Sequence, residues 1–120
     1  MISRIGLPMF PAVNRAVAIV TPKQPFLDWL HNADPTSGTL TLKEVGEPAA
    51  YLIPDVGDDE SGSACIQRYC GQIFEEQLDS WLRDTDTWPR NRDFKTFCRW
   101  FEYQVHSMVL DLCEGPLRRE

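Results

Sequence analysis

The sequence predicts a two-layer α+β domain in which about three helices pack on a small three-stranded mixed sheet, in the order β-α-β-α-α-β. Two short apolar runs, at residues 16–20 and 49–53, have the length and composition of buried strands. Between residues 61 and 83, apolar side chains recur at helical spacing. The chain of 120 residues, with four Trp, three Tyr and six Phe, supplies enough apolar surface for one hydrophobic core.

Residues 1–14 are predicted to form a loose tail, and residues 15–120 a single globular domain. Pro8 and Pro11 interrupt the tail, which shows neither a helical nor a strand period. Because the patterned sequence begins near Val13, we hypothesise that Val13, encoded by an alternative start codon, is the natural first residue.

The first strand is expected at residues 16–20 and is followed directly by a helix. Thr21 has the side chain of an N-cap, Pro22 suits the first helical position, and Gln24 follows the cap by three residues, as in a capping box. The helix then presents an apolar stripe, which consists of Phe26, Leu27, Trp29 and Leu30.

A second capping-box pattern, Thr41 with Glu44, predicts a single helical turn at 41–46. The second strand follows at 49–53, and Pro54 closes it. A helical connection between neighbouring strands of one sheet normally makes a right-handed crossover between parallel strands. We therefore expect the first two strands to be parallel.

The clearest amphipathic helix is expected at residues 61–83. On its polar side, Asp79 precedes Arg83 by four residues, a spacing that stabilises a helix through an ion pair. Its apolar side consists of Ile66, Tyr69, Cys70, Ile73, Phe74, Leu78 and Trp81.

The segment after Asn91 allows two interpretations. Its apolar residues continue at helical spacing as far as a Gly-Pro pair at 115–116, so periodicity alone favours one helix from 92 to 113. Two short strands do not form a stable sheet by themselves, however, and residues 104–112 are the remaining candidate for a third strand. We therefore predict a helix at 92–102, capped by Asn91, and a strand at 104–112.

The charge of the chain disfavours nucleic acid as a partner. The formal net charge is −6, and residues 55–86 hold nine acidic residues and two arginines. Such a surface repels phosphate backbones, whereas a protein partner, in particular a basic one, is compatible with it. We find no apolar run of about 18 residues and no signal-peptide pattern, and therefore expect a cytoplasmic protein without a membrane partner, whose four cysteines stay reduced.

The sequence predicts no catalytic residue, no metal site and no cofactor. Cys65 and Cys70 fall on different sides of one predicted helix and cannot bind the same zinc ion. A cysteine nucleophile would need His31 or His106 as its base, and Cys98 with His106 is the pair that could come close. A glycine-rich phosphate-binding loop is also missing from the sequence.

A basic stripe next to an acidic helix is the first candidate binding surface. Arg92, Lys95 and Arg99 lie on one side of a predicted helix just after Trp88, and the preceding helix carries Glu75, Glu76 and Asp79. One interpretation is an internal seam of salt bridges between the two helices. The other is a partner-docking surface anchored by an exposed Trp88, since Trp and Arg are enriched among the residues that dominate interfaces.

The second candidate is a pocket at the ends of the first two strands. If these strands are parallel, their C-terminal ends meet at one edge of the sheet, where ligands commonly bind. Thr21, Lys23 and Asp55, together with His106, are the polar residues expected there. This pocket would belong to a small enzyme or a small-molecule binder, which is the alternative to a non-catalytic protein-interaction or regulatory domain.

Seven short stretches, taken together, resemble a family of small bacterial proteins known only as conserved hypothetical proteins. They are NRAVAIVTP (14–22), FLDWL (26–30), YLIP (51–54), FEEQL (74–78), WP (88–89), FCRWF (97–101) and HSMV (106–109). The resemblance covers about residues 14–120 and implies a bacterial cytoplasmic protein. It implies no activity and no catalytic residue.

Overall fold

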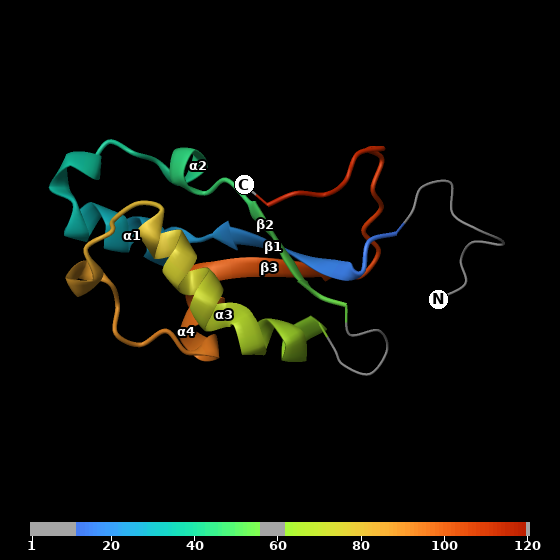
Figure 1. The fold of residues 1–120 in the computed structure, drawn as a ribbon. Helices are drawn as coiled ribbons and strands as arrows, with labels where there is room; N and C mark the ends of the chain where they lie inside the picture. The colour runs from blue at the N-terminus through green and yellow to red at the C-terminus, as the bar shows by residue number, and fades with distance from the viewer. Residues whose placement is uncertain (1–11, 56–61, 120) are drawn as a thin grey trace.

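The computed structural model describes residues 12–55 and 62–119 and confirms an α+β architecture. Within these residues, four helices, two short 3-10 turns and three strands follow one another along the chain (Figure 1). They are β1 (Arg15–Pro22), α1 (Gln24–Ala33), η1 (Pro35–Ser37), α2 (Leu42–Val45), β2 (Ala49–Pro54), α3 (Gly62–Asp79), η2 (Thr85–Thr87), α4 (Phe94–Trp100) and β3 (Phe101–His106).

The sheet has the order β2-β1-β3, and both pairs of neighbouring strands are antiparallel. The prediction of a mixed sheet with a parallel first pair is therefore wrong. Helix α1 lies beyond the end of β1 and does not fold back over the sheet (Figure 1). The chain returns through residues 38–48 instead, so β2 runs in the direction opposite to β1.

The predicted break between the last helix and the third strand is confirmed, although its position differs. Helix α4 ends at Trp100, and β3 begins at once with Phe101, earlier than the strand was expected to start. The backbone N–H of Lys23 donates to the Trp100 carbonyl over 2.8 Å, at the point where β3 starts to pair with β1. Pairing with the central strand thus replaces the helical hydrogen bonds that the apolar period predicted.

Beyond His106 the predicted strand continues only as an isolated bridge. Leu110 pairs with Ala12, and the Val13 N–H donates to the Val109 carbonyl over 2.9 Å. The end of the predicted N-terminal tail is thereby bound to the domain, while residues 1–11 of that tail lie outside the described residues.

The three predicted helix starts had different outcomes. The Thr41–Glu44 capping box is present with both of its hydrogen bonds, as predicted. Thr21 and Pro22, by contrast, belong to β1, and Lys23 is the residue that precedes α1. Asp93 instead of Asn91 caps α4, by accepting a hydrogen bond from the Thr96 N–H over 2.8 Å.

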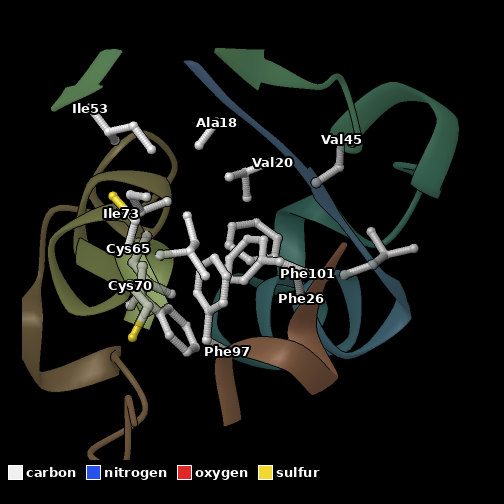
Figure 2. Close-up of a cluster of buried hydrophobic side chains, with 14 of the residues drawn as sticks. Ala18, Val20, Phe26, Val45, Ile53, Cys65, Cys70, Ile73, Phe97 and Phe101 are labelled. Atoms are coloured by element: carbon white, nitrogen blue, oxygen red, sulfur yellow. The ribbon is translucent and has the colours of Figure 1, made fainter. Parts of the chain in front are cut away.

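The longest helix, α3, matches the predicted amphipathic segment but ends four residues earlier, at Asp79. Its buried apolar side chains belong to one core cluster, to which α1, α2, α4 and all three strands also contribute. Figure 2 shows Ala18 and Val20 of β1 and Ile53 of β2 directed into this cluster. Ala16 and Ala18 of the central strand are buried in the same cluster.

Gly62 marks a close approach between the helices and the sheet. A Cβ atom at this position would lie 3.1 Å from the Cβ of Val105, on β3. The start of α3 therefore rests directly on the sheet. Within the described residues, every helix is too short or too polar to cross a membrane.

Candidate functional site

The structure places Trp88 and Arg92 in an internal seam. The Arg92 Nη2 atom lies 2.9 Å from the Glu75 Oε2 atom, and its Nη1 atom donates to the Pro89 carbonyl over 2.7 Å. The guanidinium carbon lies 5.9 Å from the centre of the Trp88 ring. The Trp88 indole N–H donates to the Leu82 carbonyl over 2.7 Å, and the side chain is partly buried. Trp88 is thus not the exposed anchor that the docking interpretation requires, and the Arg92–Glu75 contact attaches this segment to α3.

The remaining residues of the predicted docking surface are less closely connected. Glu76 accepts a hydrogen bond from the Tyr51 hydroxyl, so it joins α3 to β2. Lys95, Arg99 and Asp79 are exposed. Of the seven residues predicted for this surface, Glu75 and Arg92 form the ion pair that the seam interpretation requires.

The four residues of the alternative pocket do not come together, because the strands on which it depended are antiparallel. Thr21 pairs with Glu102 near one end of the sheet. At the same end, the Lys23 ammonium donates a hydrogen bond to the Cys98 carbonyl over 3.1 Å. Asp55 follows Pro54, which pairs with Arg15 at the opposite end. His106 pairs with Val17 toward that same opposite end.

Both histidines form hydrogen bonds with neighbouring groups of the chain, and two of the four cysteines are buried. The His31 ring forms a hydrogen bond with the Leu40 carbonyl over 2.9 Å, and the His106 ring lies 3.2 Å from the Gln104 side-chain oxygen. Cys65 and Cys70 are buried, and burial raises the pKa of the Cys70 thiol. In the part of the chain that the structure describes, no three His, Cys, Asp or Glu side chains are placed to hold a metal ion.

The feature that the sequence prediction missed is the side of the sheet that none of the described helices covers, which we call the outer face. The burial of β1 alternates strictly, and its buried residues Ala16, Ala18 and Val20 join the core. The strand register places the other side chains on the outer face: Arg15, Val17, Ile19 and Thr21 of β1, Ala50, Leu52 and Pro54 of β2, and Glu102, Gln104 and His106 of β3. Helices α1 to α4 bury their apolar side chains on the opposite side.

Leu52 is the most exposed large apolar residue of the outer face, at 52% of its maximum. It pairs with Val17, and the neighbouring pair is Ala50 with Ile19, so four apolar side chains adjoin at the centre of this face. The other exposed large apolar residues of the described segments are Trp81 of the turn after α3 and three residues of the C-terminal segment, Met108, Leu112 and Leu117.

A pocket of about 760 Å³ lies between one end of the outer face and the C-terminal segment. Arg15 and Leu52 border it from the sheet, and Leu117, Arg118 and Arg119 from the returning chain, which Figure 1 shows in red. Residues 12–14 complete the lining, and among the described residues that form it none is Asp or Glu. We call this the arginine pocket.

Only the tertiary structure creates this arrangement, since Arg15, Leu52 and Arg118 are far apart along the chain. The sequence offered one signal, namely that the alternation in β1 leaves Val17 and Ile19 on the side away from Ala18. No family model, no curated protein and no solved structure matches this chain.

A hydrogen-bonded chain on the opposite side of the sheet predicts that the stability of the protein depends on pH. The Gln77 amide donates to the Tyr51 hydroxyl over 2.7 Å, and that hydroxyl donates to Glu76. Burial, followed by the hydrogen bond to Glu76, raises the pKa of Tyr51 well above its usual value.

We therefore expect the free energy of unfolding to fall as the pH rises above about 10, the ordinary pKa of tyrosine. Below that pH both states keep the Tyr51 proton, whereas above it the unfolded chain releases a proton that the folded chain holds. Urea unfolding at pH 8 and pH 11 measures the loss. Tyr51→Phe should show a smaller loss, and Tyr69→Phe is the control. If the free energy of unfolding falls equally in the wild type and in Tyr51→Phe between pH 8 and pH 11, Tyr51 is not the group responsible.

Proposed function

We propose that this chain is a non-catalytic protein-interaction domain that binds its partner with the outer face of its sheet. The observation that supports the proposal is Leu52, a large apolar side chain that is half exposed at the centre of an apolar patch with Val17 and Ile19. Exposed apolar patches with polar borders are typical of binding surfaces. Glu102, Gln104 and His106 provide such a border along β3.

The seam between α3 and α4 is the weaker candidate surface. Trp88, Arg92 and Glu75 already contact one another or the backbone, and a partner would have to replace those contacts. The outer face requires no such replacement. We also propose a reducing compartment for the protein, in which its four cysteines would stay as thiols.

Site-specific photo-crosslinking in cells that make the protein tests the proposal. A photoreactive residue at position 52 should cross-link one recurrent protein, whereas the same residue at position 81 should not. Trp81 is the matched control because its side chain is also exposed, at 39%, but belongs to the turn after α3 and not to a strand.

The identified partner is then purified and titrated with the wild type and with Leu52→Asp. We expect affinity to fall by about tenfold or more, since a charge would face an apolar contact. The melting temperature of Leu52→Asp controls for folding. Equal cross-linking at both positions, or unchanged affinity, would rule out the outer face.

A further inference from the structure

We infer that the outer face receives an amphipathic helix whose acidic side chains pair with Arg15, Arg118 and Arg119. This inference rests on the proposed function and names the chemistry of the partner at that same surface. It depends on the charge, the hydrogen bonding and the dimensions of the arginine pocket and the adjoining face.

The charge of the arginine pocket is opposite to that of the chain as a whole. The chain has a formal net charge of −6, yet three arginines line this one pocket and none of the described residues that line it is acidic. A local basic site in an acidic protein favours partners that are acidic at that point and disfavours basic ones.

The three arginines also retain most of their hydrogen-bonding capacity. Arg15 donates one hydrogen bond, from Nη1 to the Asn14 carbonyl over 2.9 Å. Within residues 12–55 and 62–119, Arg118 and Arg119 form no hydrogen bond and no ion pair. Each guanidinium has five N–H donors in a planar fork that matches a carboxylate. An acidic ligand would satisfy donors that the chain itself leaves to solvent.

The size of the outer face favours a single helix as the occupant over a second copy of the domain. Three strands about 4.8 Å apart and roughly 20 Å long offer on the order of 300 Å². A stable dimer usually buries about 800 Å² on each partner. A helix is about 10 Å wide, and roughly 13 residues of it span 20 Å, so one helix covers the face.

The apolar patch adjoins the arginine pocket, so one amphipathic helix could contact both at once. Leu52 belongs both to the patch and to the lining of the arginine pocket. An apolar stripe at i, i+3, i+4 and i+7 would cover Leu52, Val17 and Ile19, while acidic residues beside the stripe would reach the arginines.

Fluorescence anisotropy with a designed peptide tests the inference on the full chain. The probe is a labelled helical peptide of about 14 residues with a leucine stripe flanked by glutamates, and a matched peptide has glutamine in place of each glutamate. We expect the glutamate peptide to bind about tenfold tighter, and this advantage to shrink as NaCl is added.

Two sets of substitutions locate the binding. The triple variant Arg15→Gln, Arg118→Gln, Arg119→Gln should lose the advantage of the glutamate peptide. The control variant Lys95→Gln, Arg99→Gln removes two exposed cations from α4 and should keep it. An equal loss in both variants, or no binding of the glutamate peptide at about 1 mM, overturns the inference.

Other outcomes separate the inference from the proposed function. If both peptides bind equally and Leu52→Asp abolishes both, the outer face is a docking surface but its partner is not selected by acidity. A concentration-dependent dimer that Leu52→Asp abolishes would assign the face to a second copy and overturn the inference. Cross-links to the partner from position 81 but not from 52 would refute the proposed function itself.

Discussion

Replacement of Phe74 by alanine is expected to lower the free energy of unfolding by about 3–5 kcal/mol, as the loss of a fully buried aromatic ring typically does. Phe74 is fully buried in α3. Its ring centre lies 5.1 Å from that of Phe101, 5.2 Å from that of Trp100 and 6.3 Å from that of Phe97. The substitution therefore leaves a cavity where α3, α4 and β3 meet.

Urea unfolding followed by tryptophan fluorescence measures this loss. Gln72→Ala is the control, because Gln72 lies on the exposed side of the same helix. Its free energy of unfolding should stay within about 0.5 kcal/mol of that of the wild type. Since domains of this kind are stable by only about 5–15 kcal/mol, Phe74→Ala should also melt at a visibly lower temperature. A loss below about 1 kcal/mol would mean that Phe74 is not at the centre of the core.

Tyr51→Phe is expected to lower the free energy of unfolding by about 1–3 kcal/mol, because it leaves a buried amide without its partner. Gln77 is only 7% exposed, although it lies within the apolar side of α3. Its amide donates to the Tyr51 hydroxyl over 2.7 Å, and this bond connects α3 to β2. Removal of the hydroxyl removes that acceptor.

The double variant Tyr51→Phe, Gln77→Leu provides the decisive comparison. Leucine needs no hydrogen bond, so this variant should be more stable than Tyr51→Phe alone, with a coupling energy of about 1 kcal/mol. Chemical unfolding of the wild type, both single variants and the double variant gives the coupling. Strictly additive losses would show that Gln77 and Tyr51 do not depend on each other.

Features of the fold that depend on nearby residues were predictable. The apolar runs at 16–20 and 49–53 are strands because their composition suits a buried sheet, and the Thr41–Glu44 capping box forms entirely within four residues. The third strand was predicted for another reason, namely that two strands need a third. Its start at Phe101 depends on hydrogen bonds with β1, which no local pattern encodes.

The wrong predictions for Thr21 and for the direction of the second strand depend on partners far along the chain. Thr21 could have capped a helix, but its backbone pairs with Glu102, some 80 residues later. Nothing within residues 24–48 specifies whether the chain returns over the sheet or beside it, and that choice alone decides whether β2 is parallel or antiparallel to β1. The pocket predicted at Thr21 and Asp55 depended entirely on that choice.

The sequence by itself determined the first two strands, the capped turn at 41–46 and most of the amphipathic helix, because burial of apolar area and short-range hydrogen bonds act within a few residues. The tertiary structure decided the direction of β2 and, through it, which side chains become neighbours. The antiparallel register separates Thr21 from Asp55 and brings Arg15 and Leu52 to the same end of the outer face as Arg118. The reason is physical: long-range backbone pairing selects one arrangement among several that satisfy the same local preferences.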